Sequence, residues 1–162
     1  RSDNGAFPEK LVRLVREGYR LRWEGIHGWA HWLRVRQLGL RLAERSGADP
    51  RVVELFALFH DARRHNDSWD PEHGARGAAL VESLPLADLD LDAGQRALLA
   101  FACTHHTAGF TEAEVTVGTC WDADRLDLWR IGTPPVPHRL CTDAARDPEV
   151  IRWARGLSSD MV

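Results

Sequence analysis

The sequence predicts an all-α fold, a single domain built as a helical bundle, and three observations support this prediction. Apolar residues recur at spacings of three and four along most of the chain. Proline, glycine and capping residues divide the chain into segments of ordinary helix length. No alternation of apolar and polar residues is long enough for a useful strand. Helices without a sheet bury their apolar faces against one another, which makes a bundle.

The expected helices follow one another with short connections. The spacing predicts helices over residues 8–23, 27–46, 52–64, 71–84, 92–106, 112–129 and 144–155. Pro8 stands at a favoured first-turn position, and Gly47 closes the second helix. Asp49 supplies an N-cap and Pro50 a first-turn proline for the third helix.

Turn-forming residues bound the later helices in the same way. Pro85 stops the fourth helix, and Gly109 stops the fifth. The segment Thr111–Glu114 reads TEAE, a capping box that is expected to open the sixth helix. Three prolines between residues 134 and 137 then enforce a loop before the last helix.

Length and composition bound the class of protein. A chain of 162 residues suits one domain with a sizeable core, which we expect to span residues 7–162. Residues 1–6 are expected to be disordered, removed by processing or derived from an expression vector. A net charge of −3 argues against an extended nucleic-acid or membrane surface. No apolar run approaches the roughly 20 residues of a membrane span.

The three cysteines, Cys103, Cys120 and Cys141, form no close-spaced pair. An odd number without a CxxC motif argues against a disulfide framework or a zinc knuckle. The cysteine pattern therefore fits a reducing compartment, and we expect a cytoplasmic protein.

Side chains that can bind a metal stand on apolar faces of several helices. The most apolar helix ends in His60 and Asp61. His31 heads an apolar stripe on the second helix, and Asp124, unlike Asp122, lies within an apolar stripe of the sixth. A lone buried histidine is usually a hydrogen-bonded core residue, but a buried carboxylate is costly unless it is paired. Several such residues together favour a shared divalent cation, which would offset the charge of Asp61.

The order His31, then His60-Asp61, then Asp124 resembles the H…HD…D metal-binding signature of the HD-domain superfamily. The resemblance covers about residues 27–128 and includes the segment DADRLD, whose aspartate before the basic residue, Asp124, matches the ligand. Members are all-α and mostly metal-dependent phosphohydrolases. We call His60-Asp61 the HD doublet. It is not followed by the GYP triplet of the cyclic-dinucleotide phosphodiesterases or by the glutamate–aspartate pair of the alarmone hydrolases, so the substrate stays open.

The resemblance implies that His31, His60, Asp61 and Asp124 hold one divalent metal; the alternative is an HD fold that has kept these residues without the metal. Two imidazoles and two carboxylates suit Mn, Fe, Co, Ni or Zn better than Mg, which prefers oxygen ligands. Such a metal lowers the pKa of a bound water and polarises a phosphoryl oxygen. A second metal is conceivable, because some HD enzymes carry extra histidines before the last aspartate.

Two histidines and one aspartate complete the expected catalytic group. Adjacent helix positions diverge by about 100°. We therefore expect only one of His105 and His106 to face the site, and we favour His105; a helix-end cap is the alternative role. Asp67 is expected either to orient the attacking water or bind a substrate hydroxyl, or to serve as a turn residue.

Four basic residues are candidates for substrate binding. Arg63 and Arg64 follow the doublet, where an arginine can clamp a phosphate with two hydrogen bonds. A solvated helix end explains them equally well. His27 precedes His31 by one helical turn, and His73 stands either at the pocket rim or at a helix start. The HExxH motif of metalloproteases is not formed, because its glutamate is missing.

The leading prediction is a metal-dependent phosphohydrolase that acts on a small phosphate ester, with a nucleotide as one candidate, through a metal-activated water. The first alternative is an HD-type oxygenase, which needs two irons. The second is a non-catalytic module that binds metal or nucleotide, although retention of all four ligands argues against it. A small phosphorylated substrate is thus the one expected partner, and the oligomeric state is left open.

Overall fold

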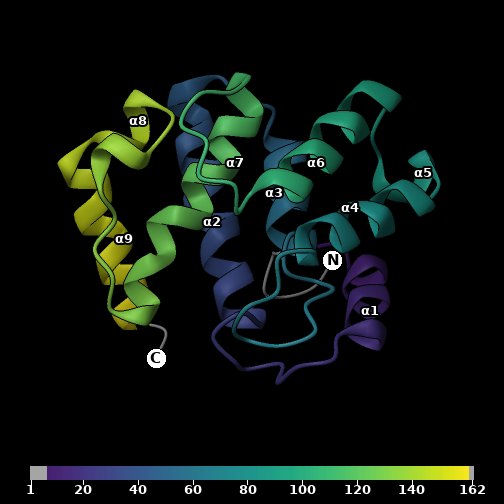
Figure 1. Ribbon diagram of the computed structural model, residues 1–162. Helices are drawn as coiled ribbons and strands as arrows, with labels where there is room; N and C mark the ends of the chain where they lie inside the picture. Colours follow the sequence, from purple (N-terminus) through teal and green to yellow (C-terminus); the bar gives the residue numbers. More distant parts are fainter. Residues whose placement is uncertain (1–6, 161–162) are drawn as a thin grey trace.

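The computed structural model in Figure 1 describes residues 7–160, so the expectation for residues 1–6 lies outside the described part. Nine α-helices and no strand form within these residues, as an all-α fold requires. None of the helices in this part is long and apolar enough to cross a lipid bilayer. The elements are α1 (Glu9–Gly18), α2 (Trp29–Ser46), α3 (Pro50–Phe59), α4 (His73–Ser83), α5 (Leu86–Leu89), α6 (Ala93–His105), α7 (Val115–Leu126), the 3-10 helices η1 (Asp127–Ile131) and η2 (Pro137–Arg139), α8 (Asp143–Arg146) and α9 (Pro148–Asp160).

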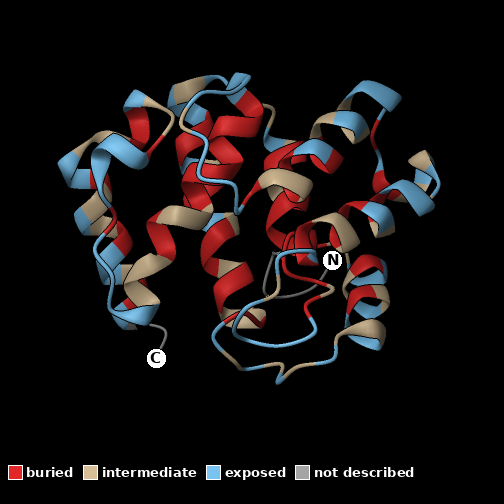
Figure 2. Ribbon diagram, viewed as in Figure 1, coloured by how far each residue is buried: buried red, intermediate tan, exposed pale blue. Residues whose placement is uncertain are grey.

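Helix α3 lies at the centre of the bundle. It packs against α2, α6 and α7, while α8 and α9 lie on the far side of α2 and α7 from α4, α5 and α6 (Figure 1). Every residue from 52 to 59 except Glu54 is buried. Figure 2 shows the buried residues gathered on α2, α3 and α7. A helix that is apolar nearly all round needs partners on every side, and this placement supplies them.

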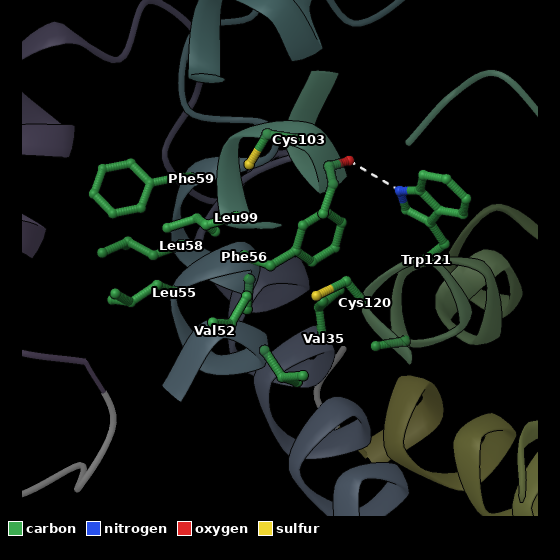
Figure 3. Packing of buried hydrophobic residues seen from close by; sticks show 14 of the residues in the cluster. Val35, Val52, Leu55, Phe56, Leu58, Phe59, Leu99, Cys103, Cys120 and Trp121 are labelled. Atoms are coloured by element: carbon green, nitrogen blue, oxygen red, sulfur yellow. Dashed lines mark hydrogen bonds between the residues drawn. The ribbon is translucent and has the colours of Figure 1, made fainter. Parts of the chain in front are cut away.

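The core closes around the end of α3, where the HD doublet follows. Phe56 packs among Leu99 and Cys103 of α6 and Cys120 of α7 (Figure 3). The indole Nε1 of Trp121 donates a hydrogen bond to a backbone carbonyl of α6, at 2.9 Å, and so ties α7 to α6. The helices that carry the candidate ligands are therefore fixed relative to one another by a continuous apolar core.

The predicted helix ends are confirmed where a cap fixes them. Gly47 ends α2 in the left-handed conformation, with φ 82°. The carboxylate of Asp49 accepts a hydrogen bond from the backbone N–H of Arg51 at the start of α3. Asp92 opens α6 as a capping box with Gln95.

Four predicted boundaries are wrong. Helix α1 ends at Gly18 rather than Trp23, because Tyr19 and Trp23 fold over Trp32 of α2, with ring centroids 5.1 and 5.2 Å from it. Helix α3 ends at Phe59, so the doublet lies in the turn after it. The remaining two errors concern the start of α7 and the continuity of the last helix.

The segment Thr111–Glu114 does not begin α7, because Glu114 itself is the N-cap and accepts hydrogen bonds from the backbone N–H groups of residues 116 and 117. The last predicted helix is split into α8 and α9 at Asp147, which is extended, with ψ 122°. The ring of Pro148 disfavours a helical conformation at the residue before it.

A close backbone approach joins α4 to α6. A Cβ atom placed on Gly74 would collide with the carbonyl oxygen of Cys103. Only glycine therefore lets these two helices approach so closely, and His73 on α4 is brought to His106 at the end of α6 as a result.

We expect Gly74→Ala to force α4 away from α6 and to lower the free energy of unfolding by about 1–3 kcal/mol, measured by urea denaturation. Gly156→Ala is the matched control, because a Cβ there meets nothing within 4 Å. The control should be neutral or slightly stabilising, since alanine is the better helix former. Equal stability of the two variants would contradict the close-approach explanation.

Candidate metal centre

Three side chains from separate elements converge near the end of α3. His31 comes from α2, His60 from the turn after α3, and Asp124 from α7. Nε2 of His31 lies 3.1 Å from Nε2 of His60. Oδ1 of Asp124 lies 3.2 Å from Nε2 of His31 and 3.3 Å from Nε2 of His60. We call these three residues the first donor group.

A second group of donors lies beside the first. Nε2 of His73 on α4 is 3.0 Å from Nε2 of His106, the residue after α6. Oδ1 of Asp61 lies 3.1 Å from Nε2 of His73 and 3.6 Å from Nε2 of His106. We call Asp61, His73 and His106 the second donor group.

Asp61 connects the two groups through its two carboxylate oxygens. Oδ1 faces the second group, whereas Oδ2 lies 3.3 Å from Nε2 of His60 and 3.5 Å from Nε2 of His31. The donor atoms within each group all lie within 4.8 Å of one another. A bridging carboxylate of this kind can contribute an oxygen to a cation in either group.

The four histidines are oriented in the same way. Nδ1 of each lies within hydrogen-bond distance of an oxygen, which leaves Nε2 for the donor groups. For His31 the oxygen is a carboxylate of Asp127, at 2.7 Å. For the other three it is a backbone carbonyl three or four residues earlier in the chain, at 2.6 to 3.1 Å.

The electrostatics of the first donor group favour a positive charge at its centre. Burial opposes protonation of His60, but the carboxylates of Asp61 and Asp124 outweigh it and raise the pKa of His60 to about 10. Burial likewise opposes ionisation of Asp61, but the surrounding histidines hold its pKa well below the usual range. Buried carboxylates that stay ionised beside imidazole nitrogens form a donor set suited to a divalent transition metal. The residues present therefore fit such a metal.

The comparisons with known proteins bear on the fold. No protein-family model matches the chain, and no curated protein matches it. The structure matches the crystal structure, at 1.45 Å, of a predicted HD superfamily hydrolase from an uncultured Thermotogales bacterium, with a TM-score of 0.71. The chain has the HD-domain fold. The match covers 96% of this chain and 88% of the other, at 23% sequence identity.

The HD-domain structure brings together the four residues expected to hold a metal. His31, His60 and Asp124 form the first donor group, and Oδ2 of Asp61 faces it. All are buried except Asp124, whose side chain is 18% exposed and so marks the open side of the group. Asp122 is fully buried outside both donor groups, where it accepts hydrogen bonds from the backbone N–H groups of residues 141 and 142.

The preference for His105 over His106 is wrong. His106 is buried in the second donor group, whereas the His105 ring packs against Phe101 and Phe110, with centroids 4.6 and 6.2 Å away. Helix α6 ends at His105. His106 follows it with helical dihedrals, and its side chain therefore points inward. His73, expected to bind substrate from the pocket rim or to start a helix, is the first residue of α4, and its side chain lies in the second donor group with 2% of the residue exposed.

The two arginines after the doublet occupy different surroundings. Arg64 is buried, and its Nε donates to Oδ1 of Asp61 at 3.3 Å. Arg63 instead donates to the backbone carbonyl of Val15. Both line a hollow of about 680 Å³ together with Tyr19, whose buried hydroxyl has no hydrogen-bond partner among the described residues.

Asp67 and His27 form a pair at the edge of the site. Nδ1 of His27 lies 2.9 Å from Oδ1 of Asp67, and the two side chains are 11% and 45% exposed. Burial lowers the pKa of His27, although Asp61 and Asp67 partly oppose this shift. An imidazole held by a carboxylate in this way has a fixed orientation and one free nitrogen.

Asp127 is the residue of the site that the sequence reasoning missed. It is fully buried, and its Oδ1 accepts a hydrogen bond from Nε of Arg34 at 2.7 Å while its Oδ2 holds His31. Burial opposes its ionisation, but His31 and Arg34 outweigh burial and lower its pKa. The available signal was its position three residues after Asp124, which places both on one face of the chain.

We expect Asp127→Asn to weaken metal binding by about ten- to hundredfold, because outer partners of a ligating histidine fix its tautomer and orientation. Competition with a fluorescent chelator measures the affinity. Asp147→Asn is the matched control, since it removes a carboxylate from the exposed pair with Arg45. Equal affinities of the two variants would show that Asp127 serves stability alone.

Proposed function

We propose that the protein is a metal-dependent phosphohydrolase that acts on a small phosphate ester or a nucleotide. The observation that carries the proposal is the placement of Asp61 between two donor groups, each suited to a divalent cation of the Mn, Fe, Co, Ni or Zn type. Two cations held by these donor groups, with Asp61 between them, would suit displacement at phosphorus. The structural neighbour is itself described as a predicted hydrolase, which agrees with the proposal.

In the proposed hydrolysis, different residues of the chain would hold the metal, transfer a proton and exclude water. A divalent cation in this centre would lower the pKa of a coordinated water and polarise a phosphoryl oxygen. Asp67 orients the His27 ring, so that Nε2 of His27 is the atom at which a proton is taken up or released. The surrounding core excludes water from the buried donors, which strengthens every charge interaction among them.

Elemental analysis of the purified protein, joined to a phosphatase and phosphodiesterase screen with several added metals, tests the proposal. We expect at least one bound transition metal per chain and metal-dependent turnover of a phosphate ester, which a chelator abolishes. Bound metal without turnover across the panel would contradict the proposal and would favour a non-catalytic metal- or nucleotide-binding module.

A di-iron oxygenase is the second candidate, and the second donor group favours it. Two irons need extra histidine and carboxylate ligands, which His73, His106 and the bridging Asp61 would supply. Iron content, an optical spectrum and oxygen consumption separate the two functions. Two irons per chain with oxygen consumption and no phosphoester turnover would replace the hydrolase proposal.

Arg64 is proposed to contact the substrate phosphate. We expect Arg64→Ala to lower kcat/KM about ten- to hundredfold, the usual contribution of a charge-assisted hydrogen bond. A guanidinium cannot ligate a cation, but Nε of Arg64 donates to the proposed ligand Asp61, so kcat/KM is compared at saturating metal, where the loss should remain. Arg63→Ala is the control, because Arg63 is held by the carbonyl of Val15, and its effect should be smaller. Unchanged kinetics in Arg64→Ala would leave phosphate binding to the metals and histidines alone.

A further inference from the structure

A pocket of about 320 Å³ opens beside the second donor group. Its lining includes His106, a member of that group, and the proline-rich loop before η2. Leu128, Pro135 and Leu140 supply apolar surface, while Arg125 and Arg139 supply positive charge. A volume of this size lies at the lower end of the range for small-molecule sites. It has room for a small organic group.

Arg125 is built into this pocket rather than lying free on the surface. Its Nη1 donates to the backbone carbonyl of Arg139 at 2.8 Å and lies 3.6 Å from Sγ of Cys141. Its Nη2 is buried and has no hydrogen-bond partner among the described residues. The guanidinium lies over the Trp121 ring, 5.7 Å from its centroid, and its charge also acts on Asp122. Nη2 nevertheless lacks a hydrogen-bond acceptor in the described part of the chain, and a buried donor without one is costly.

The position of Arg125 on α7 separates it from the metal donors. It follows Asp124 directly, and adjacent residues of a helix point about 100° apart. While Asp124 faces the first donor group, Arg125 turns to the neighbouring pocket. An anion held by Arg125 would therefore be a second group beside the reacting phosphoryl group, and not the phosphoryl group itself.

We propose that this pocket binds the leaving group of the substrate, and that the leaving group carries a second anionic group, which accepts a hydrogen bond from Nη2 of Arg125. The inference rests on the proposed phosphohydrolase function and deepens it. The preferred substrates are then small bis-anionic esters: a phosphate ester whose organic part bears a carboxylate or another phosphate. Arg125 acts as a specificity-determining residue.

A matched pair of esters tests the proposal with the metal-loaded protein: 4-carboxyphenyl phosphate and phenyl phosphate. The quantity measured is the ratio of their kcat/KM values, in which differences of leaving-group reactivity cancel between variants. We expect Arg125→Gln to lower this ratio about ten- to hundredfold, with less than about a threefold change for phenyl phosphate. Arg125→Lys, which keeps the charge, should lose less.

Arg152→Gln is the control, because it removes an exposed arginine of α9 that does not line the pocket. It should leave the ratio unchanged. An equal loss with both esters in Arg125→Gln would overturn the proposal, since Arg125 would then act through Asp124. An unchanged ratio would overturn it as well.

If neither ester is hydrolysed, the proposed function fails, and calorimetry with 4-carboxyphenylphosphonate and phenylphosphonate decides about the pocket separately. Tighter binding of the carboxylated compound, lost in Arg125→Gln, would support the pocket assignment without hydrolysis. Equal binding of the two phosphonates by the unaltered protein would overturn the assignment.

Discussion

Asp61→Ala is expected to remove metal from the second donor group and to weaken the first, with loss of any hydrolytic activity. Among residues 7–160 its carboxylate is the one group that faces both sets of histidines, and it supplies negative charge to each. Loss of a mere outer partner of a metal ligand typically costs ten- to hundredfold in affinity or activity. Loss of the bridging carboxylate itself is therefore expected to lower kcat/KM by more than about a hundredfold.

Metal content by elemental analysis and helix content by circular dichroism should be measured together for this variant. We expect the variant to stay folded or nearly so, because the apolar core around α3 is untouched. Asp143→Ala removes a fully exposed carboxylate and serves as the control. A full complement of metal in Asp61→Ala would mean that Asp61 is not a ligand.

The two aspartates of α7 should behave oppositely when each is replaced by asparagine. Asp124→Asn keeps the shape of the side chain but removes the negative charge that faces His31 and His60, so metal affinity should fall by more than about tenfold. Asp122→Asn should leave metal affinity nearly unchanged. Asp122 accepts three hydrogen bonds from Cys141 and Thr142, and an amide cannot accept all of them in the same way.

The cost of Asp122→Asn should thus appear in stability, at about 1–3 kcal/mol in urea unfolding. Metal titration and unfolding of the same two variants separate the roles. Equal losses of metal affinity in both variants would refute the assignment of the two helix faces.

The first donor group was predicted from the order of its members along the chain and from the apolar residues that recur around them at the helical period. The apolar stripe of α2 turns His31 inward, but burial does not separate the two aspartates of α7, because Asp122 is buried and the side chain of Asp124 is 18% exposed. Asp127 was missed although it follows Asp124 by three residues, because its role comes from tertiary contacts with His31 and Arg34 of α2. The choice between His105 and His106 failed because it depended on where α6 ends, to within one residue.

The second donor group was predicted only in part, for a different physical reason. His73 reaches His106 through the close approach of α4 to α6, which depends on Gly74. Such an approach is a tertiary contact between segments about thirty residues apart, and no local pattern encodes it. The misplaced ends of α1 and α7 have the same origin, since packing of Tyr19 and Trp23 and self-capping by Glu114 override the local signals.

Anomalous diffraction from crystals soaked in Mn²⁺ tests the central claim most directly, because it locates the cations without reference to activity. We predict one peak among His31, His60, Asp124 and Oδ2 of Asp61, and a second among Oδ1 of Asp61, His73 and His106. Both peaks should disappear or weaken in Asp61→Ala. Absence of a peak at the first donor group in the unaltered protein, with Mn²⁺ bound elsewhere or not at all, would contradict the account.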